Sequence, residues 1–574
     1  MRPKLGDWEA ILTLLGLRVS PTTFLRALTV AALLSAAEGA HAATSAVAAD
    51  PTMVEIQKRL TTVDLLKIDG ETVDAQALRA FYQGRGWRPA WTDNGDTLLA
   101  VLAAAELEGL PTAPLHLPAI TRLAARAGAR PVEADLLITD ALLRYAAAMR
   151  GQRVDPTAIE DDWFLPTPPF DAVAFLKDSA GDILTGLQRL QPPYAGYQLL
   201  RQKLAELKAI AVAGDWPKVP PGPPIKPGAS DERIPAVRKR IAAAGIPCAD
   251  GSDPALYDDA LLAAVQVFQQ RHGLADDGVL GRQTVAAMNV SAAERARQVA
   301  INMERWRWLP AHLEPSHIVV NVPGAWLEVV DNGKAVLTMR VVVGDPDHPT
   351  PALHAKMTSL VLNPVWRIPA SIATNEILPK LKKDPGYLIA NDLELVSDSF
   401  APGSPESQGV GIAWKELTTM PWPVRQRAGS DNALGRIKFN IPNSDDIYLH
   451  DTPNRRAFAR TFRALSHGCV RVEKPDELAL YVLNEKDWSP ERLGQQIDTG
   501  ETRTLMVAKH LPVWLLYWTT WVDADGVLQV RDDFYERDQR LAAALSQAAR
   551  TPLLVDRHLP MTPQVVRCEG CRLP

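Results

Sequence analysis

The stretch that decides the fold of the C-terminal half runs from Ile447 to Arg471 and reads IYLHDTPNRRAFARTFRALSHGCVR. Its first four residues indicate a short strand that ends at His450. Near its end stands Ser466-His467-Gly468-Cys469, in which the glycine allows a sharp turn beside the cysteine. A histidine at a strand end and a cysteine on a turn are the parts that nucleophilic catalysis needs.

Cysteine chemistry assigns these residues their candidate roles. A free thiol with a pKa of about 8.5 is only a few per cent thiolate at pH 7, so a base must take its proton. Cys469 is the candidate nucleophile and His450 the candidate base. The second ring nitrogen of that base must be held by a third group. The backbone N–H groups around His467, Gly468 and Cys469 are candidate donors to a tetrahedral oxyanion.

The order and type of these residues exclude several enzyme classes. Papain-like and NlpC/P60-type cysteine hydrolases place the cysteine before the histidine, whereas His450 precedes Cys469 here. Penicillin-binding transpeptidases need a K-T-G motif, which the sequence lacks. The eleven histidines are scattered and form no H-E-x-x-H motif, so no metal site and no cofactor are predicted.

Outward from this stretch, the sequence indicates β structure. From Ser316 onward it alternates and is rich in valine, and Asp331-Asn332-Gly333-Lys334 is a hairpin turn signal. Short strands separated by turns predict an all-β sandwich or barrel over residues 316–510. The alternation stops over residues 373–433, which we interpret as an inserted capping subdomain.

The pattern H-x15-S-H-G-C-V-R resembles the L,D-transpeptidase catalytic domain of the YkuD type. The strings VNVPGAWLEVVDNGK, VVVGDPDHPTP, LNPVWRIPASIA and LGRIKFNIPN support this resemblance. The whole layout is similar to the large multi-domain Gram-negative members, which carry a helical scaffold domain, a peptidoglycan-binding module and a capped catalytic domain. The resemblance implies a multi-domain α+β protein.

The resemblance also implies a reaction. Cys469 would attack the carbonyl at the L-centre of the third stem residue of peptidoglycan, D-alanine would leave, and a thioester would form. The side-chain amine of a second stem would then attack, giving a 3–3 cross-link and making the protein an acyltransferase of cell wall biogenesis and cell shape.

Further site residues follow from the same resemblance. The backbone carbonyl of Asp451 would orient His450, and His467 would shape the oxyanion pocket, with a structural histidine under the turn as the alternative. Arg471 would hold a substrate carboxylate or tie the turn to its own domain. The other substrate-binding candidates are Ser466, Trp366, Arg367 and Tyr387.

The N-terminal half predicts separate units. Residues 1–42 have the apolar run and A-x-A site of a signal peptide, with an uncleaved anchor as the alternative. Residues 55–215 have helical periodicity and are the expected scaffold domain. Residues 216–230 contain six prolines and predict a semi-rigid linker. Residues 231–292 resemble a peptidoglycan-binding domain of three helices, and residues 511–574 are a C-terminal extension.

Composition limits the partners and the compartment. The net charge of −5 lacks the basic excess of a nucleic-acid binder. Four cysteines in 574 residues cannot form a dense disulfide scaffold, and Cys568 and Cys571 are expected to pair locally or to matter little. The expected partners are peptidoglycan stem peptides and glycan strands, and the expected location is the periplasm. Membrane attachment is expected only if the N-terminal segment stays uncleaved.

Two other functions remain open at this point. An L,D-carboxypeptidase, or an enzyme that attaches or releases a lipoprotein, would use the same fold with a different acceptor. A non-enzymatic wall-binding protein would use residues 231–292 alone. The presence of Cys469, His450 and Gly468 argues against the second alternative but does not decide the acceptor.

Overall fold

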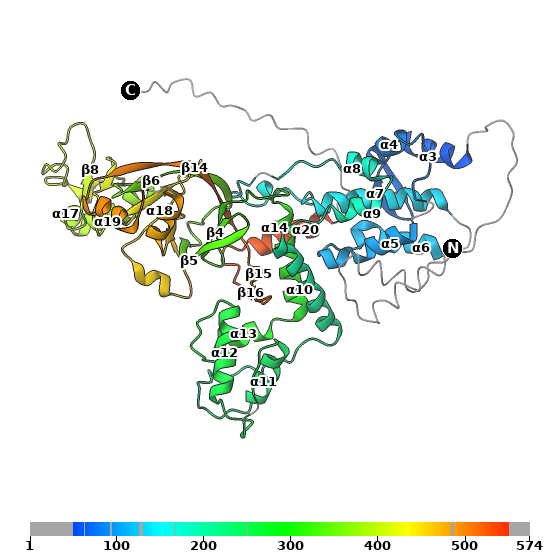
Figure 1. The fold of residues 1–574 in the computed structure, drawn as a ribbon, viewed down its shortest axis with the longest axis horizontal. Coiled ribbons are helices and arrows are strands. Elements are labelled where there is room, and N and C mark those ends of the chain that lie inside the picture. Colours follow the sequence, from blue (N-terminus) through cyan, green and yellow to red (C-terminus); the bar gives the residue numbers. More distant parts are fainter. Residues whose placement is uncertain are drawn as a thin grey trace.

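The computed structural model describes residues 50–549, except residues 62, 92–94, 126–129, 166, 250 and 484–486. The predicted signal peptide and the pair Cys568 and Cys571 lie outside the described residues. The described chain forms a helical region, a small helical module and a β-rich region, joined near the middle of the molecule (Figure 1). The predicted fold class is confirmed.

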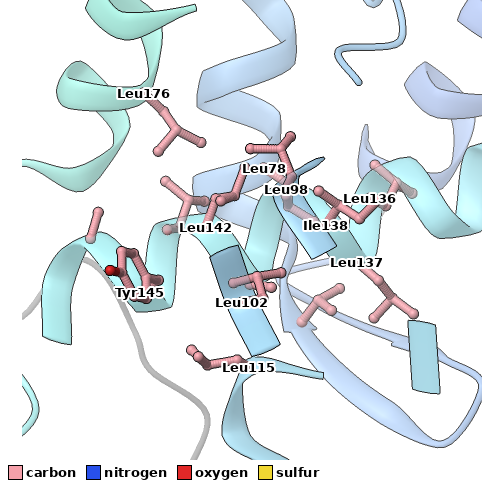
Figure 2. Close-up of a cluster of buried hydrophobic side chains, with 14 of the residues drawn as sticks. Leu78, Leu98, Leu102, Leu115, Leu136, Leu137, Ile138, Leu142, Tyr145 and Leu176 are labelled. Carbon is pink, nitrogen blue, oxygen red and sulfur yellow. The ribbon is translucent and has the colours of Figure 1, made fainter. Parts of the chain in front are cut away.

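The helical region surrounds one long central helix, α7. Pro131 at its start has no N–H to lose, and the helix is buried on nearly all sides because apolar residues cover its circumference. Leucines from the neighbouring helices pack against Leu142 and Tyr145 of α7 (Figure 2). The helices of this region are α3 (Pro51–Thr61), α4 (Ala75–Gln83), α5 (Gly95–Ala104), η1 (Ala105–Glu108), η2 (Ala113–Leu115), α6 (Leu117–Ala125), α7 (Pro131–Met149), η3 (Pro156–Ala158), α8 (Ala172–Ser179), α9 (Ile183–Gln188) and α10 (Ala195–Val212).

One element of this region differs from the helical prediction. Strands β1 (Leu65–Ile68) and β2 (Glu71–Asp74) form an antiparallel hairpin. The turn uses Asp69 and Gly70, which both have positive φ values, as a two-residue hairpin turn requires. The short Asp-Gly signal lies within a sequence dominated by helical periodicity, and the prediction missed it.

The small module consists of the three expected helices, α11 (Ile234–Ala243), α12 (Asp259–Arg271) and α13 (Arg282–Asn289). The proline-rich segment before it does not act as a free spacer. Val219 and Ile225 are buried in the core of the module, and the backbone of Ile225 pairs with Leu280. Two apolar residues among the prolines therefore attach residues 216–230 to the module itself.

The β-rich region is built on a mixed sheet that closes on itself. Its strand order is β12-β5-β13-β11-β10-β6-β14-β3-β4, and an additional pairing of β4 with β5 joins the ends. The strands are β3 (His317–Asn321), β4 (Trp326–Asp331), β5 (Lys334–Gly344), β6 (Leu353–Leu362), β10 (Ile437–Asn440), β11 (Leu449–His450), β12 (Ala464–Ser466), β13 (Val470–Val472) and β14 (Arg503–Leu516). Helices η6 (Arg455–Ala459), α18 (Pro475–Leu483) and α19 (Pro490–Asp498) accompany it.

Strand β14 crosses the boundary predicted at residue 510. It pairs with β6 over Arg503–Met506 and again over Leu511–Leu515, with a shift of register between the two runs. Lys509 and His510 lie in that irregular stretch and are exposed, so the sequence there looks like a turn although the strand continues. The extension adds strands β15 (Thr520–Val522) and β16 (Leu528–Val530) and helix α20 (Arg537–Ala548).

The capping insertion forms a subdomain with its own core. It contains α15 (Ala370–Ile372), the π-helical turn η4 (Ala373–Ile377), α16 (Leu378–Lys383), α17 (Tyr387–Ala390), β8 (Leu393–Leu395), η5 (Trp414–Glu416) and β9 (Val424–Gln426). Strand β7 (Trp366–Ile368) pairs with β9, so the subdomain begins a few residues before 373. It lies at the far end of the β-rich region from the helical region (Figure 1).

Helix α14 (Ala292–Arg307) links the module to the sheet and packs beside α10 and α20 in the middle of the molecule (Figure 1). It starts with a capping box between Ser291 and Glu294. At its other end Trp306 stacks on Trp518, with ring centroids 4.2 Å apart. The helical region and the β-rich region therefore meet on one apolar junction around α14.

Candidate active site

Five polar side chains belong to one face of three neighbouring strands. Lys438 of β10 is the register partner of His450, and His450 is the partner of Arg471 of β13. One step back in the same register, the N–H of Val470 donates to the carbonyl of Tyr448, which places Cys469 beside Tyr448. Because alternate residues of a strand share a face, Tyr448 and Cys469 join that set.

The other face of the same strands is apolar. Ile437, Phe439, Leu449, Val470 and Val472 alternate with the polar set, and each is fully buried in the main core of the β-rich region. A slip of one residue in register would expose all of them, so the core fixes the register. The same packing therefore fixes which residues face the candidate site.

The turn before Cys469 is held at several points. The hydroxyl of Ser466 donates to the carbonyl of Cys469 at 2.6 Å, and Thr350 Oγ1 donates to the carbonyl of Gly468 at 2.7 Å. Gly468 has φ of +100°, and a Cβ atom there would lie 3.3 Å from Ile447 Cδ1. In the part of the chain that the structure describes, nothing accepts a hydrogen bond from the N–H of Gly468 or Cys469. Both N–H groups can therefore serve a developing oxyanion.

The C-terminal extension also supports this turn. The hydroxyl of Tyr535 accepts a hydrogen bond from the N–H of Thr350 at 3.0 Å and donates to the carbonyl of Gly344 at 2.6 Å. Thr350 is completely buried and contacts Gly468 directly. Tyr535 therefore positions the turn before Cys469 through Thr350, although Tyr535 lies more than sixty residues beyond that turn in sequence.

His450 is buried, with one ring nitrogen occupied. Its Nδ1 lies 2.6 Å from the carbonyl oxygen of Asp451, so Nδ1 carries the proton and Nε2 is the acceptor. The carboxylate of Asp451 accepts from the N–H of Arg436 at 2.9 Å and from Arg455 at 3.0 Å, which holds that peptide in place. Burial lowers the pKa of His450 to about 3, and the charge of Arg471 acts in the same direction. His450 is therefore a neutral base at physiological pH.

Cys469 is half-buried among the polar side chains of this face. Burial raises the pKa of the Cys469 thiol, while hydrogen bonds from Tyr448 and the charge of Lys438 lower it. Burial also raises the pKa of Tyr448, and the nearby sulfur adds to this effect. At rest, therefore, Cys469 is a neutral thiol and His450 a neutral imidazole.

His467 lies in the turn before Cys469, but its side chain contacts the cap. Its Nε2 is 2.6 Å from Oε1 of Glu376 in η4, and its ring lies 4.5 Å from that of His348. The side chain is exposed by 36%, so it is not the histidine buried under the turn that the alternative described. The contact of His467 with Glu376 joins the turn before Cys469 to the capping subdomain.

The substrate-binding candidates fall into two groups. Arg471 lies on the polar face, and its buried Nε has no hydrogen-bond partner among the described residues. Trp366 hydrogen-bonds Tyr448, and the charge of Arg367 acts on Lys438, so both reach the site through these neighbours. Tyr387 lies in the cap, where its hydroxyl is 3.3 Å from Nζ of Lys380. Among the described residues, no hydrogen bond joins Tyr387 to the turn before Cys469.

Sequence reasoning missed Lys438, Tyr448, Glu376, Thr350 and Tyr535. Two of them had a usable signal, since Tyr448 stands two residues before His450 and therefore shares its face. Lys438 sits in the string LGRIKFNIPN, a predicted strand, and alternation with Ile437 and Phe439 places it on the polar side. The other three depend on contacts between distant segments, which no local pattern encodes.

Two further features, metal-ligating clusters and membrane-spanning helices, concern all of the described residues. No group of three or more potential metal-ligating side chains comes together within the described range. None of the helices in that same range is both long enough and apolar enough to span a bilayer.

Comparison with protein families matches three regions of the chain. Residues 315–502 match the family described as "L,D-transpeptidase catalytic domain", residues 76–204 match "Scaffold domain", and residues 230–288 match "Putative peptidoglycan binding domain". A Haemophilus influenzae protein named "Putative L,D-transpeptidase" is 36% identical over 284 residues, which are 48% of this chain and 57% of that protein. The aligned segment thus spans little more than half the length of this relative.

Solved structures of L,D-transpeptidases are also similar to part of the chain. One from Stackebrandtia nassauensis is 13% identical and covers 52% of this chain and 96% of its own, with a TM-score of 0.20. Another, LdtMt1 in complex with imipenem, is 14% identical and covers 35% of this chain and 59% of its own, with a TM-score of 0.17. These TM-scores are too low to add to the sequence matches.

Proposed function

Because the chain carries an L,D-transpeptidase catalytic domain together with a scaffold domain and a peptidoglycan-binding domain, we propose that it forms 3–3 cross-links in peptidoglycan through a thioester on Cys469. One observation supports this most directly. Tyr448, His450 and Cys469 share one face of the sheet, and Nδ1 of His450 is held by the Asp451 carbonyl, which leaves Nε2 as the basic nitrogen.

The first half-reaction loads the enzyme. The sulfur of Cys469 adds to the carbonyl carbon at the L-centre of the third residue of a tetrapeptide stem, and its proton passes to Nε2 of His450. The N–H groups of Gly468 and Cys469 stabilise the oxyanion. The C–N bond then breaks, His450 gives the proton to the departing D-alanine amine, and the thioester remains.

The second half-reaction transfers the acyl group. The side-chain amine of a second stem adds to the thioester carbonyl while His450 accepts a proton from the nitrogen. The C–S bond breaks, and the proton returns from His450 to the sulfur of Cys469. The product is a peptide bond between the third residues of two stems, and the enzyme is restored.

Two further residues take supporting roles in this proposal. Ser466, whose hydroxyl is committed to the Cys469 carbonyl, holds the turn rather than the substrate. Arg471 has a buried Nε without a partner among the described residues and carries a charge on the same face as His450. A guanidinium in that position suits a carboxylate of the donor stem.

Transfer rather than hydrolysis requires that an amine outcompetes water at the thioester. Water is present at roughly 55 M, so the site must position the amine and exclude solvent. The cap contacts the catalytic turn through Glu376 and His467, and this contact makes it a suitable lid. Replacing residues 373–433 with a short linker should shift products from cross-linked dimers to trimmed tripeptides. An unchanged product ratio would contradict the lid.

The deciding experiment uses purified tetrapeptide muropeptides, the full chain without its first 42 residues, and mass analysis of the products. Cross-linked dimer with loss of D-alanine is the expected result. Tripeptide without dimer would replace the proposal with an L,D-carboxypeptidase. No product, with retained binding to sacculi, would leave a wall-binding protein. Cys469→Ala serves as the inactive control.

We also propose that the enzyme works in the periplasm, because residues 1–42 have the features of a signal peptide. Fractionation of cells that express the tagged full chain tests this. Recovery of a shortened chain with the periplasmic fraction is expected. Recovery of the full-length chain in membranes would instead indicate an uncleaved anchor.

A further inference from the structure

We propose that Lys438 is a positioning residue of this site: its ammonium, held over the ring of Tyr448, supplies the positive charge that stabilises the Cys469 thiolate. The inference rests on the proposed role of Cys469 as the nucleophile. It goes beyond that role because the pairing of cysteine with histidine gives no part to a lysine on a third strand.

Register and distance put Lys438 at the site. Lys438 is the direct partner of His450 across β10 and β11, and partners across a ladder share a face. Its Nζ lies 3.9 Å from the centre of the Tyr448 ring, a cation–π contact. Tyr448 in turn stands beside Cys469 in the register of β11 and β13. The ammonium is thus fixed above the residue that adjoins the sulfur.

Lys438 lacks a counterion that would cancel its charge. Across the residues that the structure describes, no carboxylate lies within ion-pair distance of its ammonium. The side chain is half-buried, and the charge of a partly desolvated cation over an aromatic ring is screened less by water than that of an exposed cation. Holding an unpaired ammonium there costs folding free energy, and a role at the neighbouring sulfur accounts for that cost.

The two cations of this face, Lys438 and Arg471, act mainly on different groups. Among the charges that act on Cys469, Lys438 has the larger effect, and it lowers the pKa of the thiol. Among those that act on His450, Arg471 has the larger effect, and it lowers the pKa of the imidazole. Lys438 therefore mainly favours the thiolate, whereas Arg471 mainly keeps the base neutral.

Other charged groups near the pair have smaller or opposing effects. Burial lowers the pKa of Lys438, and Arg367 of β7 adds to the lowering, while the Cys469 thiolate and the carboxylate of Asp446 partly oppose it. Asp446 is exposed, so solvent screens its charge. Lys438 stays protonated near neutral pH because its ordinary pKa is about 10.4 and the opposing effects are partly balanced.

The test measures the thiol without any peptidoglycan. The full mature chain, with Cys248, Cys568 and Cys571 changed to serine, is alkylated with iodoacetamide between pH 6 and 10. Lys438→Met should raise the apparent pKa of Cys469 and slow alkylation at pH 7 by about three- to tenfold, since one pKa unit is tenfold in thiolate. Lys438→Arg keeps the charge and should stay within about twofold of the parent chain.

A matched control separates charge from packing. Lys356→Met removes an exposed lysine from β6 of the same sheet and should leave the alkylation profile unchanged. An unchanged profile in Lys438→Met would overturn the inference. So would equal slowing in Lys438→Arg and Lys438→Met with circular dichroism spectra like that of the parent chain, because only packing would then matter.

The same variants distinguish this inference from the proposed function. If Lys438→Met shifts the alkylation profile while the parent chain makes no cross-linked dimer, the thiolate role stands and the transfer activity is wrong. If the parent chain makes dimer and the profile does not shift, the activity stands and the role of Lys438 is wrong.

Discussion

Two histidines of this chain are almost fully buried, yet their electrostatic surroundings are opposite. In the helical region, both ring nitrogens of His116 contact carboxylates: Nδ1 lies 3.1 Å from Glu71 and Nε2 lies 2.7 Å from Asp140. In the β-rich region, Nδ1 of His450 donates to a backbone carbonyl. The two rings are 3% and 4% exposed, so burial alone does not distinguish them.

The charged neighbours make the difference. Asp140 also pairs with Arg144, so the charged groups around His116 are paired with one another and join α7 to neighbouring segments. His450 has the cations Lys438 and Arg471 on the strands at either side, and neither is ion-paired within the described part of the chain. Removal of one partner from a buried charge cluster destabilises the fold, whereas unpaired cations beside a site impose an electrostatic field on it.

The largest effect is expected when the sulfur of Cys469, on which the charges of Lys438 and Arg471 act, is removed. Cys469→Ala should abolish covalent modification by a carbapenem such as imipenem, a loss of at least about a thousandfold in acylation rate. Intact-mass spectrometry measures the adduct. Cys248→Ala, which changes the other free cysteine of the described chain, should keep it. An adduct that persists in Cys469→Ala would place the nucleophile elsewhere.

A change in the balanced cluster should act on stability instead. Asp140→Asn keeps the size of the side chain but leaves Arg144 buried without its counterion, so the free energy of unfolding should fall by about 3 kcal/mol. Urea denaturation measures this, and the acylation rate of the folded fraction should not change. Asp398→Asn, at an exposed position of the cap, is the control and should shift stability by less than about 0.5 kcal/mol.

Local sequence patterns predicted the strands and the turn that carry the candidate site. The alternation around Ile437 and Leu449 gave the strands, and Gly468 beside Cys469 gave the turn, because these features depend on neighbours in the chain. The fold class followed from the same periodicity together with the family resemblance. The extent of β14 was not predicted, since Lys509 and His510 are exposed within an irregular stretch of a continuous strand.

The contacts that tune the site could not be predicted from pattern. Glu376 meets His467 from an insertion about ninety residues earlier, and Tyr535 supports Thr350 from the C-terminal extension. Such pairs arise only when distant segments pack together. Periodicity describes which face a residue occupies, but it does not describe which residue of another segment it meets.

A third histidine tests how far the contrast extends. His467 is exposed and pairs with Glu376 of the cap, so this ion pair lies in contact with solvent, unlike the contacts of His116 and His450. Glu376→Gln should weaken the closed cap and lower the ratio of dimer to tripeptide by about two- to threefold, in keeping with a solvent-exposed ion pair. Glu406→Gln, an exposed change elsewhere in the cap, should leave the ratio unchanged. Equal ratios of dimer to tripeptide in Glu376→Gln and Glu406→Gln would contradict a role of the Glu376–His467 ion pair in closing the cap.

The smallest expected effect is the pH dependence of acylation, and it is the most selective test of how burial and nearby cations act on His450. Burial lowers the pKa of His450 to about 3 and raises that of the Cys469 thiol, so both groups stay neutral from about pH 5 to 8. The rate of acylation by imipenem should therefore vary by less than about twofold over that range. The unfolded chain binds more protons than the folded chain below pH 6.5, so stability falls there, and circular dichroism must confirm that the fold persists. An acid limb centred near pH 6.5 would mean that His450 titrates like a solvent-exposed histidine, and the contrast with His116 would then lie in the partners alone and not in the field.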